Sequence, residues 1–504
     1  MGDQPDATPT RHKRDEEVWR ELDLKRAEAI VRRLQERIVQ ATEKKEWRRV
    51  KSLQRLLSRS WSARACAIER VTTSRGSRTA GVDGELWLSE AAKGRALRQL
   101  CHRGYRAQPL RRVYIPKKSG GRRMLGIPTM YDRAMQAIWQ QALDPVAEVV
   151  SDPFSHGFRR LRSCWDAREH IHAVFAGKRS AEWVLDADIS KCFDQISHDW
   201  LLKNIPMAKR VLSQWLRCGV MEGLKRSETE EGTPQGGVIS PILANLTLNG
   251  LIGELDQRFV GKTRGVRKTN PHLLNAVRYA DDFLISSRTR VFIEEEVVPS
   301  ICSFLKERGL RLSESKTRVV HIGEGFNFLG YSVRKYKNGK LLIKPSKESI
   351  RSFKQKARYI LKQGIGMSAE VTFHRLNALL SGWGRYFRTA VSKEVFTALD
   401  SWLYHKVLKW GLRRHPTWGV QRVHGSYFAR DATGWLRPFK DGVPLFLLAK
   451  IPIKRHAKTP FDVNPYHRGH KERLFKLLAR RDALRFPNSL LAGSWNTATA
   501  CPHA

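Results

Sequence analysis

The sequence predicts an α+β protein of several domains, with a mixed region of strands and helices between two helical regions. Its 504 residues exceed what one hydrophobic core normally serves. Between residues 84 and 335, short β-branched and aromatic runs alternate with helical stretches, a pattern typical of mixed α/β domains. The flanking segments, 16–71 and 346–415, contain no proline, and we expect helices in both.

The N-terminal segment, residues 16–71, also lacks glycine and is dense in charge, so we expect basic helices there. The turn-rich stretch TAGVDG, residues 79–84, follows it and marks a break in the chain. The mixed region begins at this break.

The second helical segment shows apolar residues at helical spacing, as at Ile350, Phe353, Ala357 and Leu361, which predicts three helices between residues 346 and 415. This segment holds 14 Lys and Arg residues against 4 Asp and Glu, with aromatic residues interleaved. Such a surface offers both cationic grooves and stacking platforms to nucleic acid. An aromatic core with solvated basic faces is the alternative, and periodicity alone leaves both open.

The net charge of +43, from 92 Lys and Arg against 49 Asp and Glu, requires a polyanionic partner. Nucleic acid is the first candidate, because cationic contacts to its backbone supply most sequence-independent affinity. A membrane partner is not expected, since no run of about 18 uninterrupted apolar residues is present. The first residues lack the apolar core of a signal peptide, so we expect a cytoplasmic protein.

Two acidic stretches interrupt apolar runs in the mixed region. VLDADISKCFDQISHDW (184–200) carries Asp186 and Asp188 on one face of a strand-like run, where they repel unless a cation lies between them. AVRYADDFLIS (276–286) carries Asp281 and Asp282, and a simple hairpin with an Asp-Asp tip is the alternative there. Together these carboxylates are the oxygen ligands that Mg²⁺ prefers, and a pair of such ions serves phosphoryl transfer in polymerases.

Three long motifs in order give the chain a resemblance to a known family. DISKCFD (188–194), GTPQGGVISPILANL (232–246) and YADD (279–282) resemble the palm of a reverse transcriptase, in the wording of the group II intron-encoded family. LLSGWGRYFR (379–388) resembles the thumb and maturase region of that family. The resemblance covers about residues 55–465 and implies a right-hand polymerase with fingers, palm and an all-helical thumb or maturase domain.

The resemblance implies a catalytic set of acids. Asp188 and Asp281 would be the principal ligands of two Mg²⁺ ions, with Asp282 adjacent and the Ile189 carbonyl as a further ligand. Asp186 and Asp194 would support them.

The resemblance also implies contacts to the incoming deoxynucleoside triphosphate (dNTP). Phe193 would exclude a ribose 2′-hydroxyl, although an ordinary core phenylalanine is the alternative. In the basic loop KKSGGRR, Lys117 and Arg123 would hold the triphosphate, and Lys118 or Arg122 could replace either of them. The remaining nucleotide contacts are a glutamine beneath the nucleotide and a lysine that would give a proton to pyrophosphate: Gln235 and Lys316. The residues expected to contact nucleic acid are Gly236, Gly237, Trp383, Arg385, Arg388, Arg413 and Arg414.

We expect four parts along the chain: a basic helical extension over 1–70, fingers and palm over 71–335, thumb and maturase region over 336–465, and a solvated basic tail over 466–504. The histidines and the single cysteine of this tail have no metal-ligand spacing, so we predict no endonuclease there: His467, His470, Cys501 and His503.

The predicted function is that of an RNA-directed DNA polymerase that also binds its intron RNA and assists splicing and retrotransposition. Its partners would be the intron RNA, an RNA template, a DNA primer or target, and dNTPs. A bacterial reverse transcriptase of another kind, without a splicing role, is the alternative. The maturase-like wording of residues 375–416 argues against that alternative.

Overall fold

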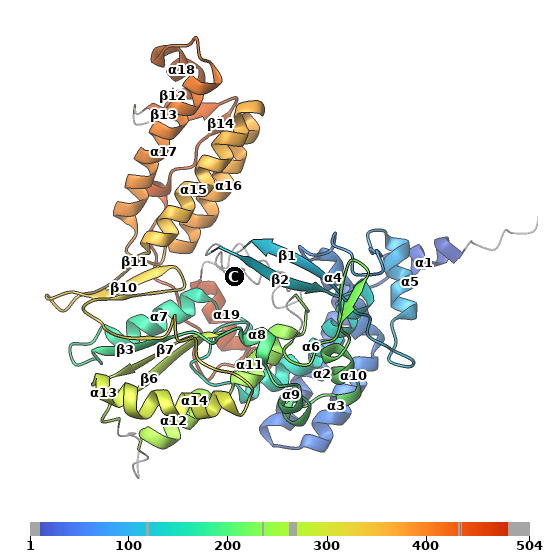
Figure 1. Cartoon of the computed structure of the whole chain (residues 1–504). Helices are drawn as coiled ribbons and strands as arrows, with labels where there is room; N and C mark the ends of the chain where they lie inside the picture. The colour runs from blue at the N-terminus through green and yellow to red at the C-terminus, as the bar shows by residue number, and fades with distance from the viewer. Residues whose placement is uncertain are drawn as a thin grey trace, which may run out of the picture. The chain divides into compact units, whose positions relative to one another are not determined.

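The computed structural model of the chain describes residues 11–116, 120–233, 236–261, 270–431, 434 and 436–481. Its described residues form two compact units (Figure 1). The first unit combines residues up to 167 with 185–319 and the segment from 458, and the second combines 168–184 with 320–457. None of the described helices has the length and hydrophobicity that a membrane crossing requires.

Helices dominate the start of the first unit and confirm the expectation for residues 16–71. They are α1 (Arg11–Arg20), α2 (Leu24–Glu43), α3 (Trp47–Arg59), α4 (Trp61–Thr73) and α5 (Glu90–Gln99). Three of them, α2, α3 and α4, pack against α6 (Met130–Val150). Buried residues occupy nearly every side of α6, so this helix is the centre of the helical core.

A hairpin and two short strands follow in a sheet of order β2-β1-β4-β5. Its strands are β1 (Leu110–Pro116), β2 (Arg122–Ile127), β4 (Val220–Glu222) and β5 (Lys225–Ser227). The β1–β2 pair is antiparallel and sets Ile115 opposite Arg123, close to the end of the hairpin.

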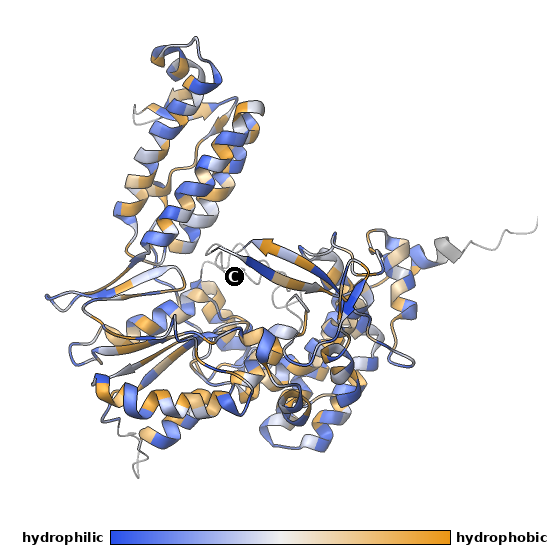
Figure 2. Cartoon of the chain, viewed as in Figure 1, coloured by the Kyte–Doolittle hydropathy of each residue, from blue (hydrophilic) through white to orange (hydrophobic). Residues whose placement is uncertain are grey.

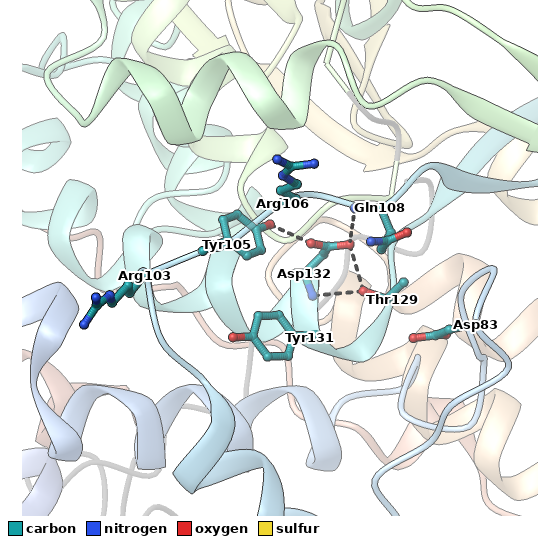
Figure 3. Close-up of a pocket in the computed structure, with 9 residues that line it drawn as sticks. Asp83, Arg103, Tyr105, Arg106, Gln108, Thr129, Tyr131 and Asp132 are labelled. Carbon is teal, nitrogen blue, oxygen red and sulfur yellow. Dashed lines mark hydrogen bonds between the residues drawn. The ribbon is translucent and has the colours of Figure 1, made fainter.

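A polar pocket of about 290 Å³ lies beside the start of α6 (Figure 3). At its wall, buried Asp132 accepts hydrogen bonds from Tyr105 Oη at 2.6 Å and Thr129 Oγ1 at 2.8 Å. Trp215 Nε1 donates in turn to Tyr105 Oη at 2.7 Å. Desolvation raises the pKa of Asp132, and these donors oppose that rise. The network fixes the start of α6, and its polar groups are hydrogen-bonded to one another.

The second sheet, of order β6-β7-β3-β8, carries the acidic stretches. Its strands are β3 (Trp183–Ala187), β6 (Asn275–Tyr279), β7 (Asp282–Ser287) and β8 (Arg318–His321). Figure 1 shows α12 (Leu251–Phe259) and α14 (Val298–Lys306) along this sheet. Helix α7 (Cys164–Phe175) precedes β3. The helices between the strands include α8 (Cys192–Gln195), α9 (His198–Asn204), α10 (Lys209–Leu216), α11 (Ser240–Leu248) and α13 (Arg290–Phe292).

The second unit begins with a sheet of order β11-β10-β9 and continues as a helical bundle. The sheet consists of β9 (Phe326–Phe328), β10 (Tyr331–Lys335) and β11 (Leu341–Pro345). The helices are α15 (Lys347–Gln363), α16 (Ala369–Phe387), α17 (Lys393–Arg414) and α18 (Val420–Tyr427). The first three confirm the helices expected over 346–415, and hydrophilic and hydrophobic stripes alternate along them (Figure 2). A small sheet that the sequence did not predict follows: β12 (Phe428–Arg430), β13 (Leu436–Lys440) and β14 (Val443–Pro444).

The C-terminal segment from residue 458 returns to the first unit and ends, within the described residues, at α19 (Lys471–Arg480). Fully buried Asp166 accepts hydrogen bonds at 2.6 Å from both Thr459 N and Arg481 Nη2. Phe461 packs edge-on against Phe154, with ring centroids 4.7 Å apart. A solvated tail is therefore wrong for residues 466–481. The average composition of this segment is basic, so it did not indicate that four of its apolar side chains are buried: Val463, Tyr466, Leu474 and Leu477.

The pair of Arg481 and Asp166 gives a test of this packing. Arg481→Met leaves the buried Asp166 carboxylate without its cation, and breaking a buried pair costs about 3–5 kcal/mol. We expect the urea midpoint of the first unit to fall accordingly. The neighbouring Arg480, the last residue of α19, is exposed, so Arg480→Met is the control and keeps the wild-type midpoint. Equal midpoints for the two variants would contradict the packing described here.

Candidate active site

The YADD stretch forms a tight hairpin between β6 and β7. Tyr279 pairs with Asp282, so Ala280 and Asp281 form the turn. Ala280 has a φ of +57°, a left-handed conformation that costs an alanine energy and often accompanies functional sites. The two aspartates do not share the tip, as the simple hairpin alternative had it, because Asp282 is already the first residue of β7.

The segment 154–157 supports this turn from beside β6. His156 N donates to Arg278 O at 2.8 Å, and Arg278 N donates to Phe154 O at 3.0 Å. A Cβ on Gly157 would lie 2.3 Å from Ala280 N, so only glycine allows this close approach. The stretch SHGFR, residues 155–159, therefore supports the β6–β7 hairpin through its backbone.

A buried cation lies behind the turn. Arg278 on β6 is 1% exposed, and its guanidinium donates to Ala280 O at 3.2 Å. Burial lowers the pKa of Arg278 to about 10, while the charges of Asp152 and Asp281 favour its protonated form. Its positive charge therefore partly offsets the negative charge of the hairpin.

Asp188 directly follows β3, beside the segment 311–318. Ser313 N donates to the Asp188 carbonyl at 2.8 Å, and Ile189 pairs with Leu312 in an antiparallel bridge. The Lys316 ammonium donates to the Asp188 carboxylate. The structure therefore places Lys316, a predicted nucleotide contact, in contact with Asp188, a predicted metal ligand.

Asp186, on the same strand face, has its own cation. The Arg318 guanidinium donates to Asp186 Oδ2 at 3.0 and 3.1 Å. Desolvation raises the pKa of Asp186, and Arg318 opposes this rise. Asp186 is therefore an ion-pair partner, which fits the supporting role expected for it.

The hairpin acids and nearby cations influence one another. Burial and the charge of Asp188 raise the pKa of Asp281, whereas the cations Lys316 and Arg123 lower it. Arg123 thus lies within electrostatic reach of Asp281, as a triphosphate-holding residue should. The hydrogen bond to Asp188 raises the pKa of Lys316.

Asp282 experiences the most negative surroundings of the cluster. Desolvation, followed by the charges of Asp281, Asp188 and Asp186, raises the pKa of Asp282 to about 8. Because part of this residue is exposed, solvent screens these charges, and the direction is the important result. Like-charged carboxylates are held together here without enough positive charge to balance them.

The acid cluster fits a hard divalent cation. Within the part of the chain that the structure describes, no group of three or more His, Cys, Asp or Glu side chains is arranged to hold a metal ion by itself. Mg²⁺ does not need such a group, since it takes one or two carboxylates and completes its shell with water and substrate phosphates. Asp188, Asp281 and Asp282 offer such an open oxygen set.

Phe193 lies on α8, five residues after Asp188, and is half-buried. Its ring contacts that of Phe158 edge-on, with centroids 6.4 Å apart. Phe158 is 49% exposed and has a φ of +55°, another conformation that is rare for a bulky residue. The sequence motifs gave Phe158 no role; its position beside Gly157 was the available signal.

Gly236 lies close to strand β2 of the β1–β2 hairpin. Thr233 N donates to Phe193 O at 2.6 Å. Gly236 has a φ of +110°, and a Cβ there would lie 3.0 Å from Gly126 O on β2. Gly237 is buried beside it. The predicted contacts Lys117 and Gln235 lie outside the described residues.

The residues expected to contact RNA from the second unit differ in their surroundings. Trp383 packs against the rings of three phenylalanines at 4.5–5.9 Å: Phe353, Phe387 and Phe396. Arg414 donates to Gly364 O at 2.9 Å, at the end of α15, and Arg388 is half-buried. Only Arg385 and Arg413, among these predicted residues, are exposed. Trp383 therefore fits the alternative in which the aromatic residues of this segment form a hydrophobic core.

Three segments of the chain match known protein families. Residues 115–333 match the family described as reverse transcriptase (RNA-dependent DNA polymerase). Residues 19–100 match the N-terminal domain of reverse transcriptase, and residues 350–428 match the group II intron maturase-specific domain. The reverse transcriptase match includes Asp188, Asp281, Asp282 and Lys316. Its fold is that of a right-hand polymerase, and the family generally uses divalent metal ions.

Curated relatives agree with these matches. Protein YkfC of Escherichia coli K12 is 35% identical over 320 residues, which cover 56% of this chain and 83% of the relative. The group II intron-encoded protein LtrA of Lactococcus lactis is 32% identical over 335 residues, 54% of this chain and 55% of LtrA. Maturase-like protein 1 of Euglena gracilis is 25% identical over 375 residues, 69% of this chain and 75% of the relative. The chain belongs to the group II intron-encoded family of reverse transcriptases and carries the maturase-specific domain of that family.

Proposed function

We propose that Asp188, Asp281 and Asp282 bind two Mg²⁺ ions, and that the chain adds deoxynucleotides to a primer 3′-hydroxyl on an RNA template. The observation that carries this proposal is the electrostatic coupling of the β6–β7 turn to Asp188, at the end of β3. When bound, the metal ions would activate the 3′-hydroxyl and stabilise the leaving oxygen. The Ile189 carbonyl, next in sequence to Asp188, would complete the ligand set.

The cations near the acids would bind the triphosphate. Arg123 extends from β2 and acts on Asp281 through space, so it would hold phosphate oxygens near the metals. Lys117 and Gln235, which lie outside the described residues, would complete this binding. Lys316 carries its proton beside Asp188, which supports its role as proton donor to pyrophosphate.

Sugar selection would depend on an aromatic pair. Phe193 would exclude the 2′-hydroxyl, and Phe158 would hold the Phe193 ring in place through their edge-on contact. The strained backbone of Phe158 supports this, because residues in rare conformations cluster at functional sites.

The second proposed activity is binding of the intron RNA to assist splicing. The match to the maturase-specific domain over residues 350–428 supports it and disfavours a reverse transcriptase without a splicing role. Gly236 and Gly237 would contact the template, and exposed Arg385 and Arg413 would contact RNA. The proposed functional division remains residues 1–70, 71–335 and 336–465. The reverse transcriptase match lies within the second part and the maturase match within the third, whereas the N-terminal match, residues 19–100, crosses the boundary between the first two parts.

The first prediction concerns catalysis. Asp281→Asn removes one metal-binding charge, and we expect primer extension on an RNA template to fall by at least about 100-fold. Splicing of the intron RNA at low Mg²⁺ should remain at the wild-type level, since it does not use the acid cluster. Glu295→Gln removes an exposed acid elsewhere and serves as control. Full polymerase activity of Asp281→Asn would refute the assignment, and absence of splicing with wild-type protein would refute the maturase role.

The second prediction concerns the sugar. Phe193→Ala should raise kcat/KM for ribonucleotides relative to deoxynucleotides by about tenfold or more, since it opens space for the 2′-hydroxyl. Phe158→Ala should shift the ratio in the same direction by a smaller factor, because Phe193 remains but loses its support. Single-nucleotide incorporation kinetics measure both ratios. An unchanged ratio in both variants would show that these rings do not select the sugar.

The third prediction concerns pH. In the metal-free chain, Asp282 keeps its proton to a higher pH when folded than when unfolded, where its pKa is about 3.9. The unfolded state therefore releases this proton first, and the free energy of unfolding should fall as pH rises from about 4 to about 8.

Urea titrations in the presence of a chelator would measure this slope. Asp282→Asn should flatten it, whereas the control Glu295→Gln should keep it. A slope that persists unchanged in Asp282→Asn would mean that this carboxyl does not experience the negative surroundings described above.

A further inference from the structure

Three cations surround one indole ring on the surface of the second unit. Lys354 Nζ and Arg358 Cζ, both on α15, each lie 5.4 Å from the centroid of Trp402. Lys406 Nζ, on α17 with Trp402 itself, lies 5.8 Å from the same centroid. Arg358 is exposed, and the other three residues are partly exposed. We call these four residues the Trp402 cluster.

Acidic residues on the same helices do not neutralise the Trp402 cluster. Glu348 on α15 accepts a hydrogen bond from Asn327 at 3.0 Å, and Glu394 on α17 pairs with Lys344 at 3.6 Å. Asp400 accepts from the main-chain N–H groups of Leu448 and Ala449 at 3.0 and 2.8 Å. These are all the acids that α15 and α17 carry, and each has its own partner.

The cluster continues a wider basic surface. Helix α15 carries six Lys and Arg residues against one Glu. Cations held near one another repel unless an anion joins them, and an aromatic ring alone offsets only about 0.5–1 kcal/mol for each exposed cation. The cluster therefore suits an anionic ligand that presents several charges to its three cations.

We propose that the Trp402 cluster binds the phosphodiester backbone of a nucleic acid, with the indole edge available to a sugar or base. Backbone phosphates a few ångströms apart match separate cations around a ring, and an aromatic among cations is the usual platform for single-stranded RNA. This inference rests on the proposed RNA-binding role of the second unit and names the site that serves it. It replaces Trp383, which lies in the aromatic core, as the aromatic contact. The phosphates come from the intron RNA or from the primer–template duplex.

The test is the salt dependence of binding. The triple variant Lys354→Gln, Arg358→Gln, Lys406→Gln removes three phosphate contacts. The slope of log K against log salt should therefore become shallower by about 2 on single-stranded RNA and by about 3 on a duplex. Separate titrations with the intron transcript and with a primer–template duplex identify the source of the phosphates.

A matched control removes three exposed cations from the same unit, in the variant Lys337→Gln, Lys340→Gln, Lys347→Gln. A slope change in the first triple variant that exceeds the control, on either ligand, supports the site. Equal slopes for the two triple variants on both ligands would overturn it. Trp402→Phe keeps the packing of α17 and should weaken binding several-fold without changing the slope.

Two further measurements separate this proposal from the proposed function. Primer extension at saturating substrate should be unchanged in the triple variant, because the acid cluster is intact. Failure of wild-type protein to stimulate splicing would refute the maturase role, whereas the slopes measured on the duplex would still decide whether the Trp402 cluster binds phosphate.

Discussion

The crowding of carboxylates at the β6–β7 turn is the constraint on which the rest of the structure depends. Asp281 and Asp282 lie within reach of the charge of Asp188, and the like charges of the three carboxylates repel one another. Such a cluster is tolerated only where the fold supplies cations or leaves room for them. Lys316 at Asp188 and buried Arg278 behind the turn provide part of that charge, and a divalent metal would provide the remainder.

Distant parts of the chain hold this cluster in place. The segment 154–157 fixes the turn through main-chain hydrogen bonds and the close approach of Gly157. Phe461 of the C-terminal segment packs on Phe154 in turn, so the C-terminal segment supports the same hairpin indirectly. A polymerase site whose geometry must be kept within a fraction of an ångström benefits from such packing on its supporting side.

The sequence predicted the chemistry better than the surroundings of the side chains. Asp188, Asp281 and Lys316 were identified from motifs, because acids within apolar runs are too costly to occur without a function. Trp383 and Trp402 have similar composition around them, and only tertiary packing decides which ring lies among phenylalanines and which lies among cations. The prediction of a solvated C-terminal tail was wrong for a related reason. Leu474 and Leu477 are buried on one face of α19, although the average composition of this helix is basic. The left-handed backbone of Phe158 depends on contacts that no local pattern encodes.

The most direct test of the central claim counts the metal ions. Mn²⁺ can replace Mg²⁺ in oxygen sites, and electron paramagnetic resonance measures the free ion during a titration of the protein with primer–template and a dNTP. The account predicts two bound ions for each wild-type chain and a loss of that binding in Asp188→Asn. The same number of bound ions in wild type and Asp188→Asn would contradict it.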